Sequence, residues 1–481
     1  MECEKLNWES KMEKTDKLIH LWKKRNLSII GKILIIKTLI LPIFTFLASA
    51  CVVPEQYVKE IESKCFKFIW DEKPDKVKRA VLCAPYTNGG LQMVNFFSYF
   101  KALKASWVNR LVHPSPANWK LIPQKYFGVL GKNWLIFKLN LDNKKILDYI
   151  RNIPCFYKEV LKSWIFAGGG QTKTPKTFSD IRKQIIWGNK YITHKNDYVI
   201  FQNWIKSDII FINDIIGNDG NISYEYIFTK LINKSNWIAE YSILRQSLPR
   251  EWIVKLRSED SIKSFVNTRR DKFRFDGKYA DFSLLDNKCY YNIIVSKKLE
   301  MSIGVQRWLR ELSEENTSFK HLFIFIFSIL EDNRLKMYKW KLSQYILPNK
   351  KLLFQWKLSN DNLCNFCKQE ENYEHFFISC KYLSDFWRKI YQILEKSGIK
   401  NSITLKHLVI GYKISDKDYN SFNLFLTIVG FSVYKSYYVS EQKSKYINVY
   451  QIFKREYTNI INVKSGMYRT PLLNCFYKNM L

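Results

Sequence analysis

The sequence predicts a mainly α-helical protein, and three observations lead to that expectation. Apolar residues make up 47% of the 481 positions, which is enough to bury substantial cores. In several long segments these residues recur at the three- and four-residue spacing of a helix that buries one face. Polar and glycine-containing interruptions concentrate between residues 171 and 300, so we expect a mixed region of short elements there.

Helices are expected first in the N-terminal part. Residues 6–41 have helical periodicity, and Ser28 is a suitable cap for a second helix because its hydroxyl can accept a free backbone N–H. Pro54 is expected to begin a further helix that ends near residues 70–74, where the composition is typical of a turn.

The next elements are expected to alternate between turns and helices. Residues 79–82 are predicted to be extended, and the Asn-Gly-Gly sequence at 88–90 to form a turn that needs a positive φ angle. A helix is expected over residues 95–111, and the pattern stays helical and aromatic-rich over 117–170.

In the second half, residues 217–221 predict a β-turn between short elements. Residues 301–396 contain two amphipathic helices, the second of which begins near Tyr382. Another helix is expected over 422–438, followed by a basic tail.

One apolar segment, residues 27–53, resembles a membrane span in composition. A span needs about 20 consecutive, predominantly apolar residues, but Lys32 and Lys37 interrupt the first half and Pro42 divides the rest. We therefore expect a buried helix pair or a helix with a proline bend, and no membrane partner. Membrane association through residues 27–53 is kept as an alternative.

The charge balance points to a polyanionic partner. Lys and Arg number 77 against 44 acidic residues, a net charge of +33, and such an excess favours binding to the phosphates of RNA or DNA. The alternative is a lysine-rich composition spread over solvated faces. Most cysteines are dispersed and the N-terminus is charged, so an intracellular location, in the nucleus or cytoplasm, is expected.

Four residues form a metal-binding pattern, C-x2-C-x7-H-x4-C: Cys364, Cys367, His375 and Cys380. Three thiolates and one imidazole are ligands of closed tetrahedral zinc sites. Because protein ligands fill all four positions, this zinc is expected to hold structure rather than to activate water. The alternative is three buried core thiols with an incidental histidine.

Several motifs together resemble the region after the palm in reverse transcriptases of non-LTR (LINE-type) retrotransposons. The segment Trp22–Pro42 is similar to the W-x-x-R-x-L-S-x-x-G-[KR] … I-K … L-P pattern of that family's thumb. Phe68–Met93 resembles the following F-x-W … K-[IV]-x-R … G-G-L-x-[ML] run, and Trp204–Ser223 resembles a later segment. Leu335–Leu347, the four metal-binding residues and Phe386-Trp387 resemble the family's zinc-binding domain.

The resemblance covers about residues 5–440 and implies five parts. These are thumb-like helices at 1–55, a helical connector at 56–166, a mixed α/β linker region at 167–300, the zinc-binding domain at 301–396, and C-terminal helices with a basic tail at 397–481. The chain is thus expected to be the C-terminal part of the polyprotein, and the missing polymerase segment is an expected partner.

No polymerase activity is expected from this chain alone. Polymerisation needs paired aspartates that hold two metal ions, which the family presents as [YF]-A-D-D. The nearest string, Tyr279-Ala280-Asp281-Phe282, has a single aspartate and is assigned no role. No small-molecule substrate is expected either.

The resemblance to a thumb implies backbone contacts from cations on helix faces. The expected residues are Lys23, Lys24, Arg25, Lys32 and Lys37, together with Lys368, Lys381 and Arg388 beside the zinc module. Phe376 and Phe377 are more suited to packing against the following helix than to stacking on bases. The expected function is nucleic-acid binding that supports target-primed reverse transcription in an intact element. A domesticated, zinc-dependent protein-interaction module is the alternative.

Overall fold

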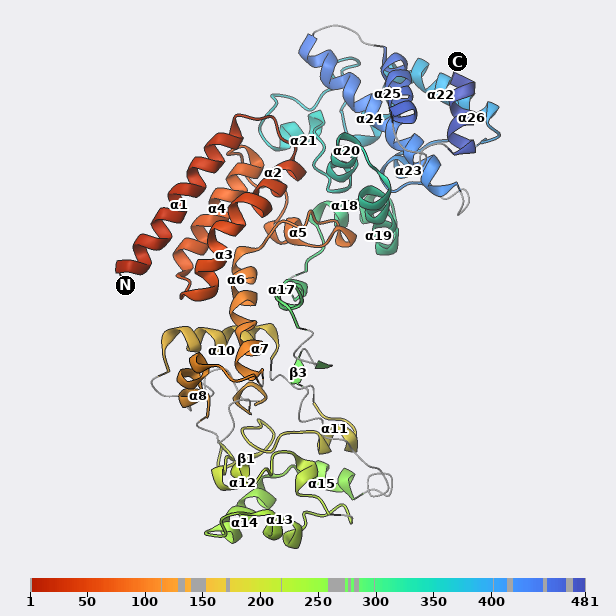
Figure 1. Cartoon of the computed structure of the whole chain (residues 1–481). Coiled ribbons are helices and arrows are strands. Elements are labelled where there is room, and N and C mark those ends of the chain that lie inside the picture. The colour runs from red at the N-terminus through yellow and green to blue at the C-terminus, as the bar shows by residue number, and fades with distance from the viewer. Residues whose placement is uncertain are drawn as a thin grey trace. The chain divides into compact units, whose positions relative to one another are not determined.

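The computed structural model shows a mainly α-helical protein, which confirms the predicted fold class (Figure 1). It describes residues 2–113, 115–128, 135–139, 153–169, 174–217, 219–257, 273–275, 278–280, 285–297, 299–400, 402–412, 418–443, 448–463 and 470–480.

The helices and strands follow one another in this order. Up to residue 94 they are α1 (Glu2–Lys23), α2 (Ile29–Ile35), the π-helical η1 (Ile36–Ile40), α3 (Leu41–Ala50), α4 (Glu55–Trp70), α5 (Arg79–Cys83) and the 3-10 helix η2 (Tyr86–Asn88). Between residues 95 and 298 they are α6 (Phe96–Ala105), α7 (Trp107–Val112), η3 (Asn118–Lys120), α8 (Leu121–Phe127), η5 (Leu135–Phe137), α10 (Cys155–Ala167), α11 (Phe178–Arg182), β1 (Thr193–His194), β2 (Asp197–Tyr198), α12 (Gln202–Lys206), η6 (Ile212–Asp214), α13 (Tyr224–Lys230), α14 (Trp237–Ser247), α15 (Arg250–Leu256), β3 (Phe273–Phe275), β4 (Lys278–Ala280) and α17 (Asn287–Ser296). The remainder has α18 (Ile303–Glu311), α19 (Asn316–Ile324), η8 (Phe325–Ile329), α20 (Asn333–Ser343), α21 (Lys350–Gln355), η9 (His375–Ser379), η10 (Lys381–Leu383), α22 (Ser384–Lys396), α23 (Leu405–Val409), α24 (Tyr419–Lys443), α25 (Val449–Val463) and α26 (Pro471–Met480).

The chain divides into two compact units, each built from segments that are distant in sequence. Unit one consists of Met1–Leu18, Thr38–Ser63 and Asn95–Lys298, and unit two consists of Ile19–Lys37, Lys64–Val94 and Leu299–Leu481. The five domain boundaries expected from the sequence remain predictions.

The apolar segment near the N-terminus is one helical run, as α2, η1 and α3 follow without a break. Ser28 caps it, because its Oγ accepts the Gly31 N–H at 3.2 Å. The π-helical turn η1 lies directly before Pro42, where an irregular turn fits the lack of a proline N–H. By length and composition alone, Ile29–Ala50 could cross a membrane, and 33% of its most apolar window is buried in the protein.

In unit one, α6 packs on α10 and α17. Two of the buried tryptophans donate their indole N–H groups to backbone carbonyls. Trp164 donates to the Phe137 carbonyl at 2.9 Å and Trp187 donates to the Ile209 carbonyl at 2.7 Å. Two antiparallel strand pairs, β1–β2 and β3–β4, also belong to this unit. The predicted turn at 217–221 is present, since the Gly220 N–H bonds to the Gly217 carbonyl at 3.1 Å. Of the four-residue aspartate string, Asp281 and Phe282 lie outside the described residues.

In unit two, the turn at 88–90 is hydrogen-bonded to side chains of α20 and the residue that follows it. Gly89 has a φ of +77°, as predicted, and a Cβ there would approach the Phe323 ring to 2.4 Å. Its carbonyl accepts the Trp340 indole N–H at 2.9 Å and the Gln344 amide at 3.0 Å. This turn is therefore part of the folded core around α20.

The extended conformation expected for residues 79–82 is wrong: these residues belong to the helix α5. The Val81 N–H and the Leu82 N–H both bond to the Lys78 carbonyl, at 3.0 and 3.3 Å. Consecutive apolar residues suggested a strand, but Val81, Leu82 and Cys83 are all buried in the short helix. The N–H groups of Leu91 and Met93 in the following segment both bond to the Leu82 carbonyl at 3.0 Å. Tertiary burial outweighs the local pattern here.

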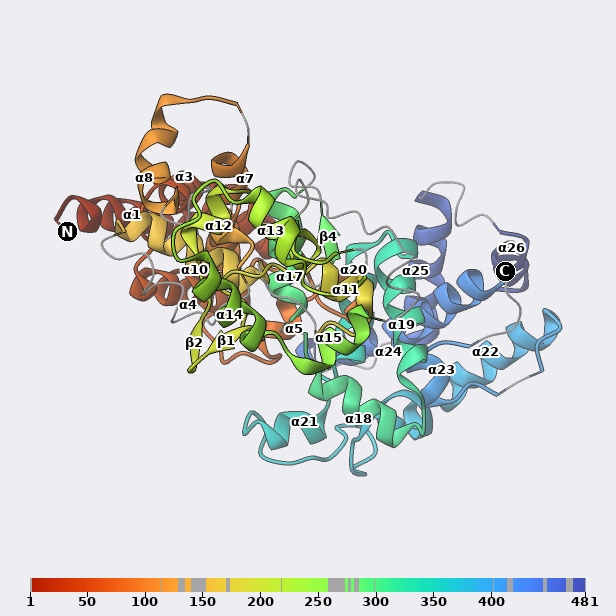
Figure 2. The ribbon, with the colours of Figure 1, turned by 90° about the horizontal axis from the view of Figure 1, so that it is seen from below.

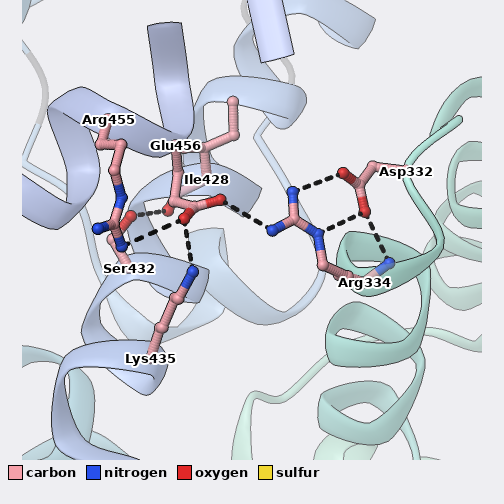
Figure 3. Close-up of polar contacts among 7 residues, drawn as sticks. All are labelled: Asp332, Arg334, Ile428, Ser432, Lys435, Arg455 and Glu456. Carbon is pink, nitrogen blue, oxygen red and sulfur yellow. Dashed lines mark hydrogen bonds and ion pairs between the residues drawn. The ribbon is translucent and has the colours of Figure 1, made fainter. Parts of the chain in front are cut away.

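The C-terminal helices pack on the zinc-binding part of unit two. α24 lies along α25, α26 contacts both, and α20 contacts α24 (Figures 1 and 2). The side chain of Glu456 in α25 is 2% exposed and faces Lys435, Arg334 and Arg455 (Figure 3). Its carboxylate lies 2.6 Å from Lys435 Nζ and 3.4 Å from Arg334 Nη1, so it links α25 to both α24 and α20.

Candidate metal centre

The first two ligands of the metal pattern sit in a tight hairpin. Leu363 and Glu370 form an antiparallel bridge, and the Cys364 N–H donates to the Gln369 carbonyl at 2.8 Å. The chain reverses through Lys368, whose φ is +59° and whose N–H bonds to the Cys364 carbonyl at 3.0 Å. This turn brings the Cys364 and Cys367 thiols to the same side.

The other two ligands come from the segment that follows. The Asn372 carboxamide accepts the His375 N–H at 2.8 Å and so fixes the start of the π-helical turn η9. The Cys380 N–H bonds to the His375 carbonyl at 3.1 Å, which closes the turn. Cys380 then precedes η10 and α22, whose predicted apolar face is buried.

The four ligand atoms converge, and all lie within 4.8 Å of one another. The Cys364 and Cys380 sulfurs are 3.9 Å apart, the Cys367 and Cys380 sulfurs 4.0 Å, and Cys367 Sγ is 3.1 Å from His375 Nε2. A tetrahedral zinc with ordinary bond lengths would hold its ligand atoms about 3.6–3.8 Å apart. The measured distances bracket these values and none exceeds 4.8 Å, so the four residues are placed to share one zinc ion.

The ionisation of the ligands follows from their burial and mutual contacts. Hydrogen bonding to Cys380 and burial raise the pKa of the Cys364 thiol, whereas the hydrogen bond from Cys364 lowers the pKa of Cys380. Burial lowers the pKa of His375, which favours the neutral imidazole that binds metal. Binding of zinc releases thiol protons, so zinc affinity rises with pH.

A buried carboxyl beside the ligands has no counterpart in the sequence prediction. Glu371 is 1% exposed, and its Oε1 accepts the Lys350 N–H at 2.7 Å. Burial raises the pKa of Glu371 to about 8. In sequence Glu371 cannot be told from the exposed neighbour Glu370, so only the fold reveals its position.

Aromatic side chains of the module mostly form its core. Phe376 and Phe377 are buried, as expected for packing, and Trp387 donates to the Phe377 carbonyl at 2.9 Å. Phe366, in contrast, is 38% exposed and stacks on Tyr382 with ring centroids 4.2 Å apart.

The predicted nucleic-acid contacts all belong to unit two but differ in their surroundings. Seven are exposed: Lys23, Lys24, Arg25, Lys37, Lys368, Lys381 and Arg388. Among them, Arg25 lies over the Trp22 ring at 4.6 Å, and Lys23 and Arg388 pair with Glu72 and Asp385.

Lys32 is the exception, because it is buried. Its Nζ lies 2.5 Å from Asp71 Oδ1 and 3.4 Å from the Ile69 carbonyl. The structure brings the four metal ligands together. The contacts of the eight cations with nucleic acid remain predictions.

Comparison with protein families gives an independent assignment for this part of the chain. Residues 305–387 match the family model described as zinc-binding in reverse transcriptase. The matched range contains α19, α20, α21 and all four metal ligands. The chain therefore contains a reverse-transcriptase-associated zinc-binding domain, with Cys364, Cys367, His375 and Cys380 as its zinc site.

Proposed function

We propose that this chain is the part of a LINE-type retrotransposon reverse transcriptase that follows the palm, and that it binds nucleic acid. In an intact element it would hold RNA or DNA during target-primed reverse transcription, with the polymerase segment as partner. The observation that carries the proposal is the zinc site within residues 305–387, which match a zinc-binding domain of reverse transcriptases.

The zinc has a structural role in this proposal. Four protein ligands leave no open coordination position for a reacting water, and the sequence has no aspartate pair of the polymerase type. The chain is therefore proposed to make no DNA by itself. Its proposed location is inside the cell, in the nucleus or cytoplasm. Its net charge of +33 supports contact with phosphates.

The test is a binding titration of the full, zinc-loaded chain with fluorescently labelled RNA, single-stranded DNA and duplex DNA. Binding through phosphates gives an affinity that falls linearly with salt on logarithmic axes, by about 0.7–0.9 per phosphate contacted. An affinity that does not change with salt concentration, or no binding at about 50 mM salt, would contradict the proposal and favour the protein-interaction alternative. Protein that remains in the pellet after carbonate extraction would favour membrane association instead.

A further inference from the structure

A cavity of about 510 Å³ lies in unit two, between α19, α23 and the start of α24. Figures 1 and 2 both show α23 beside α19 and α24. Four aromatic side chains from these helices and the residues next to them line the cavity: His321, His407, Tyr412 and Tyr419. We call it the histidine–tyrosine pocket. Its volume lies within the range of about 300–1,000 Å³ that is usual for sites that bind small molecules.

The rings of His407 and Tyr412 are held against each other by the fold. Their centroids are 4.5 Å apart, with the ring planes at 87°. Buried Asn423 fixes the backbone here, because its Oδ1 accepts the Tyr412 N–H at 2.8 Å and its Nδ2 donates to the Tyr412 and Tyr419 carbonyls at 3.2 and 2.8 Å. Gly411 permits this contact, since a Cβ there would lie 2.5 Å from Asn423 Oδ1. The position of the aromatic wall is therefore set by the fold itself.

The polar groups of the pocket offer hydrogen bonds but little net charge. Among the lining residues, the one carboxylate, Glu314, is paired with the one lysine, Lys406, and it also accepts the Ser318 hydroxyl at 2.7 Å. His407 Nδ1 accepts the Thr404 N–H at 3.1 Å, so the neutral ring carries its proton on Nε2. Burial lowers the pKa of His407, and Lys406 lowers it further, which keeps the ring neutral near pH 7. The pocket thus suits an uncharged ligand that has both donors and acceptors.

We propose that the histidine–tyrosine pocket binds one unstacked nucleobase of a single-stranded nucleic acid, an inference that rests on the proposed function. A base is flat and uncharged at neutral pH, and it carries donors and acceptors on its edges, so it matches aromatic rings bordered by polar groups. The lysine that lines the pocket is already paired with Glu314, so the base rather than the phosphate is the group recognised. The bases of a duplex are stacked and paired and do not enter, so the pocket favours single strands.

The experiment uses the full, zinc-loaded chain and two matched histidine variants. His407→Asn keeps a side-chain acceptor for the Thr404 N–H but removes the ring and its Nε2–H from the pocket. His194→Asn makes the same change at a half-buried histidine of β1 in unit one, outside the pocket. Each protein is titrated over a salt series with a labelled single-stranded RNA of roughly 12 nucleotides and with a duplex of the same sequence. The thermal unfolding of each protein is recorded alongside.

His407→Asn is expected to bind the single strand at least about fivefold more weakly, the lower end of what one stacked base contributes. The slope of affinity against salt should stay the same, since no phosphate contact is lost. Binding of the duplex, and all binding by His194→Asn, should change less than about twofold. His321→Ala should also weaken single-strand binding. Because the His321 side chain is exposed, a loss of binding at an unchanged unfolding temperature excludes misfolding as the cause.

A second measurement locates the base. The single-stranded RNA carries 5-iodouracil at one position at a time and is crosslinked to the wild-type protein by irradiation, and the modified residues are identified by mass spectrometry. Crosslinks to His407, Tyr412 or Tyr419 are expected with the single strand and not with the duplex.

Three outcomes would overturn the inference. If His407→Asn and His321→Ala bind the single strand as tightly as the wild type and no crosslink falls in the pocket, the pocket assignment is wrong and the proposed function stands. If the two variants lose binding to the duplex and to the single strand alike, the rings support the fold and no base enters. If the wild type binds neither RNA nor DNA, both the inference and the proposed function are wrong.

Discussion

The buried carboxylate of Glu456 offers a sharp test of how the C-terminal helices are held to the zinc-binding domain. Glu456→Gln keeps the size of the side chain and removes its charge. The carboxylate is 2% exposed, and it faces Lys435 at 2.6 Å, Arg334 at 3.4 Å and Arg455 at 3.7 Å (Figure 3). Removing one partner of a buried ion pair costs about 3–5 kcal/mol in the free energy of unfolding.

The cost at Glu456 should lie at or somewhat below the lower end of that range. Lys435, Arg334 and Arg455 are 28%, 55% and 60% exposed, so each can regain water once the carboxylate is gone. We expect a loss of about 2–4 kcal/mol. Arg455→Gln is the matched control: its guanidinium is exposed and 3.7 Å away, so its loss should cost less than about 1 kcal/mol.

The assay is urea unfolding of the zinc-loaded protein, with hydrogen exchange of peptides from α20, α24 and α25 as a local readout. Faster exchange in those helices is expected for Glu456→Gln and not for Arg455→Gln. If Glu456→Gln changes stability by less than about 0.5 kcal/mol, or if the two variants are equally destabilised, the reasoning from burial is refuted.

Three further results are expected. Mass spectrometry of purified protein should find about one zinc per chain. His375→Ala should lose most of this zinc, whereas Glu370→Gln, which changes an exposed neighbour, should keep it. Full zinc content in His375→Ala would contradict the assigned site. Burial lowers the pKa of Lys339 from 10.5 to about 7. Above pH 7 the unfolded state therefore binds more protons than the folded state. The free energy of unfolding should rise from pH 7 toward pH 10 by at most about 1.4 kcal/mol per pH unit. Lys339→Met should flatten that rise in urea titrations, and an unchanged slope would exclude the lysine as its source. Gly304→Ala should destabilise the protein, because a Cβ there would lie 1.8 Å from the Gln344 carbonyl oxygen. Gly31→Ala, whose Cβ would have only ordinary contacts from 3.5 Å, should stabilise the protein by up to about 1 kcal/mol. Thermal unfolding temperatures that change in the same direction for both variants would refute this.

The helical class and the zinc ligands were predictable because both depend on short-range patterns. The apolar face of α22 and the cap at Ser28 follow directly from residue spacing, and both are present. The metal site was equally accessible, since four ligands within 17 positions must converge through local turns. Such features depend little on the rest of the chain.

What sequence reasoning missed depends on contacts between distant segments. The helix α5 replaces an expected extended segment, and its consecutive apolar residues Val81, Leu82 and Cys83 are all buried. Lys32 looked like an exposed cation, but it is buried and pairs with Asp71, 39 positions away in the sequence. The Glu456 network joins residues of α20, α24 and α25 that are far apart in the sequence, and no periodicity in the sequence marks it.

The carbonyl of Gly89 has a practical consequence for anyone who wishes to isolate the zinc-binding domain. A shortened polypeptide that starts near residue 299 would keep every metal ligand yet lack the acceptor shared by Trp340 and Gln344. Two buried donors would then be left unsatisfied, at a cost of about 1–3 kcal/mol each. Supplying residues 64–94 as a separate peptide should restore the missing acceptor and with it part of the lost stability, so this segment is a candidate for complementation in trans.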